Sequence, residues 1–348
     1  MEEYLLAFFA TLSIVLLITP FVIELAKKTG ALDVPDKRKV HKEPIARIGG
    51  TAIYIAFTSV VLGYFFINGD LALEISGLLV SGTFIFLVGI IDDYKNIPAK
   101  VKLLGQIAAA LILALFFNVR IEFISDPFGD YLFLEEFAIP VTVLWIVSLT
   151  NTVNLIDGLD GLAAGVSAIA CVTIFLVALE QNVFVVAFLT AALAGSAFGF
   201  LYYNFNPARI FMGDSGSMFL GFILAGISII GSVKSAAALS LIVPILALGL
   251  PIMDTAFAII RRKRAGVPIF KPDRGHLHHR LLDLGLSQRQ AVLLMYVISS
   301  LLGMAAISIT LVNSGQIAMI IIVAVLFMVL YGAKKIGIFR MNEPPKTL

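Results

Sequence analysis

The chain has 348 residues, of which 59% are hydrophobic and 14% are charged, and its formal net charge is +2. Soluble domains carry about 25% charged residues, so this composition excludes an ordinary soluble protein and indicates an integral membrane protein. The single cysteine, Cys171, excludes an intrachain disulfide and a four-cysteine metal site.

Eleven apolar segments are long enough to be transmembrane helices, for which roughly 17 to 25 residues suffice. The ninth contains Pro244 and Pro251, so we expect it to be kinked or broken. We predict an all-α polytopic membrane protein in which residues 1–348 form a single membrane-embedded domain. The predicted spans are 4–26, 48–67, 71–91, 103–118, 137–154, 161–179, 183–203, 216–231, 236–260, 290–312 and 316–333.

Basic residues fall almost entirely into one set of connecting loops, which holds 23 of the 25 Lys and Arg. The other set contains only Arg120 and Lys234. The positive-inside rule therefore predicts an outside N-terminus and a cytoplasmic C-terminus. Together with the turn 155–160, the basic loops other than the C-terminal tail are expected to form a cytoplasmic active site. These loops are 27–47, 92–102, 204–215, 261–289 and the tail from residue 334.

Two polar motifs follow predicted spans. Asp92 and Asp93 close the third span in GIIDDYKN, where a solvated helix end is an equally good interpretation. The string NTVNLIDGLDGLAAG holds four amide and carboxylate side chains in ten residues at membrane depth. A plain turn needs fewer of them, and buried polar groups are costly. Its polar residues are Asn151, Asn154, Asp157 and Asp160.

A third motif, NFNPARIFMGDSGS, places Asp214 directly before a predicted helix. Such a string can be a helix N-cap. It also suits a phosphate or metal-phosphate site, because free backbone N–H groups and the helix dipole favour anions there. Phe211 in the same motif offers a ring that can stack on a base. Alone, the motif is ambiguous.

Two basic loops complete the pattern. The loop RRKRAGVPIFKPDRGHLHHR begins with cations that would also serve as a topology signal. Its histidines would suggest zinc, but their spacing does not match the usual ligand sets, and a grip on a sugar phosphate is favoured. The first loop, LDVPDKRKVHKEPIARIGG, is also basic, and binding to anionic lipid is the simpler interpretation of it.

These motifs lie on the same predicted side of the membrane. Carboxylates from three segments can hold a divalent cation, and cations from the other loops can hold phosphates. Mg²⁺ takes one or two protein carboxylates together with phosphate oxygens and water. The combination predicts a magnesium-dependent phosphoryl-transfer site, in which catalysis is mainly positioning and charge neutralisation.

In this order the motifs resemble the polyprenyl-phosphate N-acetylhexosamine-1-phosphate transferases. The resemblance covers nearly the whole chain, from HKEPIARIGG to the HLHH motif. The histidine motif is similar to that of the WecA/TagO-type undecaprenyl-phosphate GlcNAc-1-phosphate transferases, with Leu277 in place of the usual isoleucine. An eleven-span count also fits this branch better than the ten-span phospho-MurNAc-pentapeptide transferases, whose fold it is expected to share.

The resemblance implies roles for individual residues. Asp214 would be the main Mg²⁺ ligand, with Mn²⁺ as a substitute, and Asp92 would contact the metal or the lipid phosphate. Asp92 and Asp93 would include the catalytic base, although which of them is left open. Asp157 and Asp160 would help to bind the nucleotide or the metal, and together these four acids are the predicted catalytic residues. The predicted substrate-binding residues are Lys42, Lys102, Asn154, Asn204, Phe211, Arg262, Asp273, His276, His278 and His279.

Two further positions follow from the resemblance. Asp33 matches an acid of the first loop with a less settled role. Some WecA-type enzymes have another acid four residues after the first of the pair, where this chain has Asn96, so no catalytic acid is expected there.

The predicted reaction is transfer of GlcNAc-1-phosphate from UDP-GlcNAc to undecaprenyl phosphate or another polyprenyl phosphate, with release of UMP. This would be the first lipid-linked step of a cell-envelope polysaccharide at the bacterial inner membrane. Direct displacement is favoured, and a covalent aspartyl-phosphate route stays open. The alternatives are another UDP-N-acetylhexosamine or UDP-MurNAc-pentapeptide as donor, or an ion-coupled transporter. The expected partners are these substrates and membrane lipids rather than nucleic acid, and a homodimer is left open.

Overall fold

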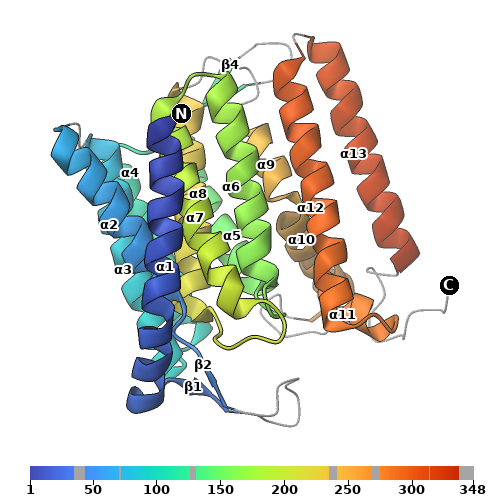
Figure 1. Cartoon of the computed structure of the whole chain (residues 1–348). Helices are drawn as coiled ribbons and strands as arrows, with labels where there is room; N and C mark the ends of the chain where they lie inside the picture. Colours follow the sequence, from blue (N-terminus) through green and yellow to red (C-terminus); the bar gives the residue numbers. More distant parts are fainter. Residues whose placement is uncertain are drawn as a thin grey trace.

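The computed structural model describes residues 1–34, 44–69, 72–125, 131–234, 241–267, 275–312 and 314–336. Within these ranges nearly all of the chain is helical, and most helices run side by side in one bundle, with α12 and α13 together at one side (Figure 1). The predicted all-α polytopic fold is confirmed. Lys42 and Asp273, two of the predicted substrate-binding residues, lie outside the described residues.

Ten helices of the described part are long and apolar enough to cross a membrane. They coincide with ten of the eleven predicted spans, and their ends differ from the prediction by a few residues. Their bounds are α1 (Glu2–Thr29), α2 (Gly50–Asn68), α3 (Leu73–Lys95), α4 (Ala99–Phe116), α5 (Ala138–Ile156), α6 (Leu162–Glu180), α7 (Phe184–Asn204), α8 (Gly213–Lys234), α12 (Gln288–Leu311) and α13 (Gly315–Ile336).

The ninth predicted span is not a single helix. Leu248 separates its two parts, and Pro244 and Pro251 each occupy the third position of one part. Proline has no backbone N–H, but the first turn of a helix needs none, so the break accommodates both prolines. The predicted break is confirmed, whereas a continuous membrane-long helix here is wrong within the described residues. The two parts are α9 (Ile242–Ala247) and α10 (Gly249–Arg264).

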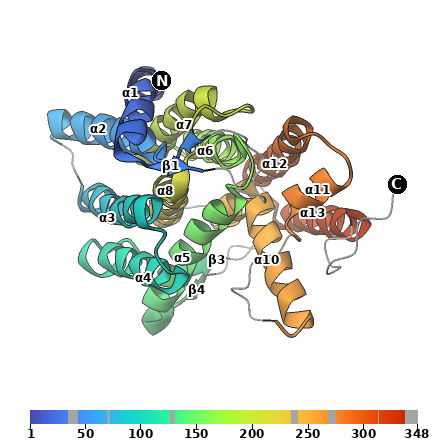
Figure 2. The same cartoon turned by 90° about the horizontal axis from the view of Figure 1, so that it is seen from below.

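The central helix of the bundle is α8. Nearly all of its membrane-length segment is buried, whereas little of that of α13 is buried. A helix that is apolar all round is stable only when other elements surround it, and α8 packs against α2, α3, α5 and α7. Seen along the bundle, α8 lies between α3, α5 and α7 (Figure 2). Whatever α8 carries at its first turn is therefore enclosed by neighbouring helices.

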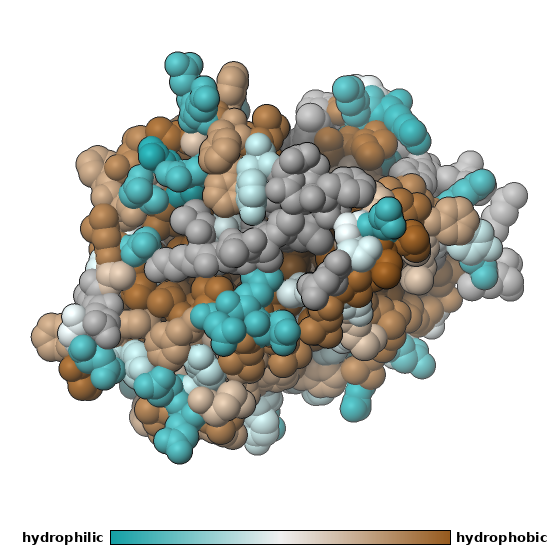
Figure 3. Space-filling view, turned by 90° about the horizontal axis from the view of Figure 1, so that it is seen from above, coloured by the Kyte–Doolittle hydropathy of each residue, from teal (hydrophilic) through white to brown (hydrophobic). Residues whose placement is uncertain are grey.

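Two small antiparallel hairpins lie at opposite ends of the bundle and were not predicted (Figure 1). The end that bears β3 and β4 shows hydrophilic residues scattered among hydrophobic ones (Figure 3). At the other end, β1 and β2 bring the first basic loop back against the start of α2. The remaining elements are β1 (Leu32–Asp33), β2 (Ile45–Ala46), β3 (Phe123–Ser125), β4 (Tyr131–Phe133), the 3₁₀-helix η1 (Glu135–Phe137) and α11 (Leu277–Asp283).

Candidate functional site

The first turn of α8 is pressed between the backbones of α2 and α3. A Cβ atom added to Gly50 would lie 2.1 Å from the backbone nitrogen of Gly216, and one added to Gly89 would lie 2.4 Å from Cα of Ser215. Only glycine permits such close approach of two backbones. Because Asp92 and Asp93 follow Gly89 by one helical turn, this packing brings them beside Asp214.

Asp93 holds the N-terminus of α8. One of its carboxylate oxygens accepts a hydrogen bond of 2.7 Å from the backbone N–H of Asp214. The other accepts from the backbone N–H of Ser215 at 3.1 Å and from its hydroxyl at 2.5 Å. The first N–H groups of a helix have no intrahelical partner. A carboxylate placed there accepts from them and also interacts favourably with the positive end of the helix dipole. The contacts of Asp93 are therefore those of a helix cap, and its catalytic role stays a prediction.

Asp92 and Asp214 converge on one cation, the ammonium group of Lys102. Its Nζ lies 3.2 Å from Oδ2 of Asp92 and 2.6 Å from Oδ2 of Asp214. The second oxygen of Asp92 accepts from the backbone N–H of Ile97 at 2.8 Å. Asp92 is 2% exposed, so the carboxylate is held rigidly, and the convergence predicted from the sequence is observed for this pair.

Sequence reasoning missed Arg47. Its guanidinium lies 3.6 Å from Asp92, 3.5 Å from Asp93 and 3.7 Å from Asp214. It also donates to the Asn96 side chain at 2.8 Å. Arg47 thus contacts all three acids. Asn96, at the position where no catalytic acid was expected, accepts a hydrogen bond from the arginine and helps to hold it in place. The sequence feature that could have identified Arg47 is its position two residues before the Gly49–Gly50 pair, which packs on the GDSGS motif.

Backbone hydrogen bonds join the first loop to the loop that precedes α8. Ala46 and Ile210 form a parallel bridge, and the N–H of Phe211 donates to the carbonyl of Ala46 at 2.8 Å. The N–H groups of Gly49 and Gly50 donate in turn to the carbonyls of Phe211 and Met212, at 3.0 and 2.8 Å. These hydrogen bonds hold the backbone on either side of Arg47 and so place its side chain beside the acids. The Phe211 ring is half-buried, and its stacking on a base stays a prediction.

The turn after α5 supplies a further acid, Asp157. Burial, together with the nearby charges of Asp214, Asp93 and Asp160, raises the pKa of Asp157 from 3.8 to about 8. Burial is the larger cause, and the negative neighbours reinforce it. Asp157 therefore lies within electrostatic reach of the acids on α3 and α8, as its predicted role requires.

The other polar residues of this turn hold the loop between α7 and α8. Asp160 accepts hydrogen bonds from the Asn206 side chain at 2.9 Å and from the backbone of Ala208 at 3.1 Å. Asn204 accepts from the N–H of Gly161 at 3.0 Å and donates to the carbonyl of Ile210 at 2.8 Å. These contacts position the turn, and the predicted roles of Asp160 and Asn204 toward the nucleotide stay predictions.

Asn154 lies one turn before Asp157 on α5. Its side-chain amide donates to the hydroxyl of Ser217 on α8 at 2.9 Å, so it ties these helices together beside the acids. Asp33, in β1, pairs with Ile45 of β2 and thereby helps to return the first loop to the bundle. The predicted contact of Asn154 with substrate stays a prediction, and no role was assigned to Asp33.

The histidine motif forms the start of α11 and packs against the same turn. The ring of His278 lies against Gly158, where an added Cβ would be 2.6 Å from Nε2 of the histidine. Burial and the neighbouring His279 lower the pKa of His278 to about 3, so its ring is neutral at physiological pH. His276 stacks on His278, with ring centroids 5.8 Å apart. The two loops predicted to share a site are thus adjacent.

The donor set fits a magnesium ion. Mg²⁺ needs only one or two protein carboxylates, because water and phosphate oxygens complete its shell. Asp92 and Asp214 already direct one oxygen each toward a single cation, Lys102 Nζ. Within the described residues no group of three or more His, Cys, Asp or Glu is arranged as a metal site.

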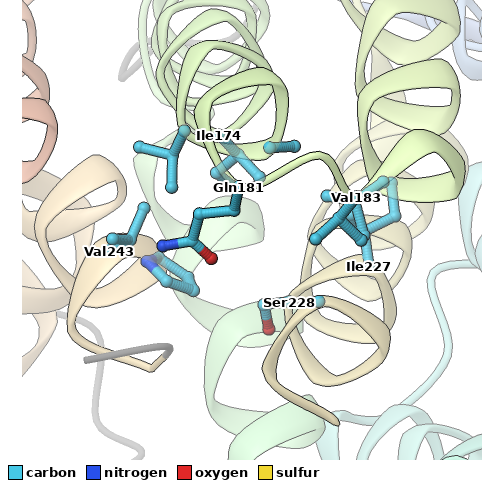
Figure 4. A pocket seen from close by; sticks show the side chains of 11 residues that line it. Ile174, Gln181, Val183, Ile227, Ser228 and Val243 are labelled. Carbon is cyan, nitrogen blue, oxygen red and sulfur yellow. The ribbon is translucent and has the colours of Figure 1, made fainter. Parts of the chain in front are cut away.

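A cavity of about 40 Å³ lies far from the acids, between the end of α6, the start of α7 and the later turns of α8 (Figure 4). Its lining is mostly aliphatic, and Gln181 and Ser228 are its polar members. Since Asp214 lies at the opposite end of α8, this cavity takes no part in the candidate site.

A first prediction follows from Asp157. The unfolded chain ionises this residue above pH 3.8, whereas the folded protein retains the proton to about pH 8. Between these values a rise in pH favours the unfolded state. Asp157→Asn cannot ionise, so it should raise the melting temperature clearly at about pH 8.5 and much less at about pH 5.

The measurement is thermal unfolding of the detergent-solubilised protein in EDTA, since a bound cation would itself favour the ionised acid. Glu122→Gln is the control, because Glu122 is exposed and belongs to a surface ion pair with Arg120. An equal change in melting temperature at both pH values for Asp157→Asn would contradict the raised pKa.

Helices long enough to cross a membrane and a buried cluster of carboxylates and cations define a multi-pass membrane protein with an enzyme-like site. The family described as glycosyl transferase family 4 matches residues 75–232, which hold all the acids of the cluster. The chain belongs to this family of membrane-bound transferases, because a relative 42% identical to it covers nearly its whole length.

That relative is a probable undecaprenyl-phosphate N-acetylglucosaminyl 1-phosphate transferase of Bacillus subtilis (strain 168), aligned over 94% of this chain and 91% of its own. A decaprenyl-phosphate N-acetylglucosaminephosphotransferase of Mycolicibacterium smegmatis is 37% identical over 88% of this chain and 82% of its own. An undecaprenyl-phosphate alpha-N-acetylglucosaminyl 1-phosphate transferase of Escherichia coli (strain K12) is 28% identical, over 81% and 77%. The family resemblance inferred from the motifs is thus confirmed.

Proposed function

We propose that the chain transfers GlcNAc-1-phosphate from UDP-GlcNAc to a polyprenyl phosphate, releasing UMP and forming polyprenyl-diphospho-GlcNAc. The observation that carries this proposal is the convergence of Asp92 and Asp214, from α3 and α8, on Lys102, with Arg47 beside them. The names of the relatives above support the acceptor and the sugar. They are transferases, which also favours this function over an ion-coupled transporter.

In the proposed reaction an oxygen of the lipid phosphate attacks the sugar-linked phosphorus of the donor. The bond from this phosphorus to the oxygen of UMP breaks, and UMP leaves with that electron pair. Arg47 and Lys102 neutralise the negative charge that three phosphoryl groups bring together, which is the main task in phosphoryl transfer. A magnesium ion held by Asp92 and Asp214 would supply further neutralisation of the diphosphate.

The position of the cluster supports a lipid acceptor. Asp92 lies near the C-terminal end of α3 and Asp214 at the start of α8, so both are at helix ends rather than in the middle of the bundle. A polyprenyl phosphate carries its phosphate at the depth of the lipid head groups, level with such helix ends. We propose that this end of the bundle faces the cytoplasm of a bacterial cell, because the loops there hold 23 of the 25 basic residues.

The test is release of UMP by the purified protein in lipid nanodiscs that contain undecaprenyl phosphate, with UDP-GlcNAc and Mg²⁺. We expect stoichiometric UMP and a diphospho-GlcNAc lipid, both identified by mass spectrometry, and loss of both in EDTA. UDP-GalNAc and UDP-MurNAc-pentapeptide serve as competing donors. Absence of UMP with every donor would refute the transferase, and a preference for another donor would refute only the sugar assignment.

The same assay tests orientation. UDP-GlcNAc does not cross a bilayer, so sealed inside-out vesicles should release UMP and intact spheroplasts should not. The reverse result would place the cluster outside. Rapid-quench trapping of a phosphorylated protein would favour the aspartyl-phosphate route over direct displacement.

A further inference from the structure

One buried acid lies outside the cluster described above. Asp254, on α10, is 4% exposed, and both of its carboxylate oxygens contact the histidine motif. Oδ2 lies 2.9 Å from Nδ1 of His276, and Oδ1 accepts a hydrogen bond of 2.8 Å from the backbone N–H of Leu277. A single side chain of α10 therefore fixes both the imidazole ring and the first N–H of α11.

The surroundings of Asp254 explain why these contacts matter. An apolar cavity of about 390 Å³ lies between α10, α12 and α13, and among the described residues that line it Asp254 is the one charged residue. A carboxylate beside apolar space is costly unless hydrogen bonds or an opposite charge compensate it. In the described structure His276 and the Leu277 N–H provide that compensation, so the acid and the histidine are held as a unit.

The contact also determines what the histidine presents to the site. An ionised carboxylate only accepts hydrogen bonds, so this contact favours the tautomer of His276 with the proton on Nδ1. Nε2 points away from Asp254 and lies 3.5 Å from the guanidinium of Arg262. The His276 ring stacks nearly parallel on His278, which packs against Gly158. Through this row of rings, Asp254 is connected to the turn that carries Asp157.

We propose that Asp254 is a positioning residue that fixes the orientation and the tautomer of His276, so that Nε2 faces the sugar-phosphate end of the bound donor. The inference rests on the proposed function and on the predicted contact of the histidine motif with the donor. An aspartate that orients a histidine through Nδ1 and leaves Nε2 for the substrate is an arrangement that enzymes use repeatedly. Both carboxylate oxygens of Asp254 are engaged by the histidine motif, so its effect on the donor would pass through His276.

A double-mutant cycle on Asp254→Asn and His276→Gln tests this role. Asp254→Asn should lower kcat/KM for UDP-GlcNAc about tenfold to a hundredfold, because its amide group no longer selects the Nδ1-protonated ring. In the His276→Gln background the same change should cost less than about twofold. An equal loss in both backgrounds would show that Asp254 does not act through His276 and would overturn the proposal.

The matched control is Asp283→Asn, which removes an exposed acid from α11 itself and should leave kcat/KM unchanged. The melting temperature of each variant confirms that it is folded. If Asp283→Asn lowered kcat/KM as much as Asp254→Asn, the effect would belong to the charge of the region, and the proposal would fail.

A second readout needs no substrate and therefore separates this inference from the proposed function. Solid-state NMR of the protein with ¹⁵N-labelled histidine should show the His276 ring, assigned by its loss in His276→Gln, protonated at Nδ1 in the wild type. Asp254→Asn should shift the proton to Nε2. A wild-type ring protonated only at Nε2 would overturn the positioning role, even if UMP is released and even if Asp254→Asn does not fold. Failure to release UMP with the expected NMR result would instead refute the transferase.

Discussion

Asp214→Asn should reduce UMP release about a thousandfold while leaving the protein folded. The carboxylate of Asp214 lies 2.6 Å from Nζ of Lys102 and 3.7 Å from the guanidinium of Arg47. Asparagine keeps the shape of the side chain and the backbone N–H that donates to Asp93, but it removes the charge that gathers these cations. The substitution thus isolates the electrostatic contribution of the acid from its place in the fold.

The measurement is kcat for UMP release together with the melting temperature of the variant. Glu122→Gln removes one acid from an exposed ion pair at the other end of the bundle and should leave both values unchanged. If a folded Asp214→Asn protein kept more than about a tenth of wild-type turnover, the assignment of the site to this cluster would be wrong.

Gly89→Ala should have the second largest effect, on activity and on stability together. The new methyl group would lie 2.4 Å from Cα and 2.6 Å from the backbone nitrogen of Ser215. Because the obstructing atoms are backbone, neither helix can relieve the overlap by a rotamer change, and α3 must move away from α8. We expect a loss of about 1 to 3 kcal/mol in the free energy of unfolding.

The same movement would carry Asp92 and Asp93 away from Asp214. A displacement of about 1 Å can cost a hundredfold in rate, so turnover of the folded fraction should fall by roughly that factor. Gly63→Ala is the matched control, since Gly63 is also inside a helix but an added Cβ there meets nothing within 4 Å. That variant should be as stable as the wild type or slightly more stable. Equal behaviour of the two variants would contradict the close packing of α3 on α8.

Much of the helical fold could be predicted from the sequence, because the apolar segments are long and nearly free of charge. The break in the ninth span was also predictable from Pro244 and Pro251, but its place at Leu248 was not. Two prolines permit several break points, and the packing of both short helices against α12 is tertiary information that no local pattern contains.

The candidate site was predicted in part for a similar reason. The adjacency of Asp92 and Asp93 in sequence gives no hint that they differ, yet Asp93 caps the first turn of α8 whereas Asp92 contacts Lys102. Arg47 was one of seven basic residues in its loop, and only the hairpin and the bridge to Ile210 direct it to the acids. Asp254 lies inside the ninth predicted span, but its partner His276 lies 22 residues further along the chain, and no local pattern joins the two.

The backbone hydrogen bonds between the first loop and the loop before α8 limit how this site can change. Its bonds run from main chain to main chain, through Ala46, Gly49, Phe211 and Met212. Apart from the glycines, side chains are not needed to keep the two segments in register. The side chains of Ala46, Ile210 and Met212 are nevertheless buried, and buried positions tolerate few changes of size or polarity. Backbone hydrogen bonds and packing therefore fix the same line of contact, and an exchange there is expected to displace the acids as well as to destabilise the fold.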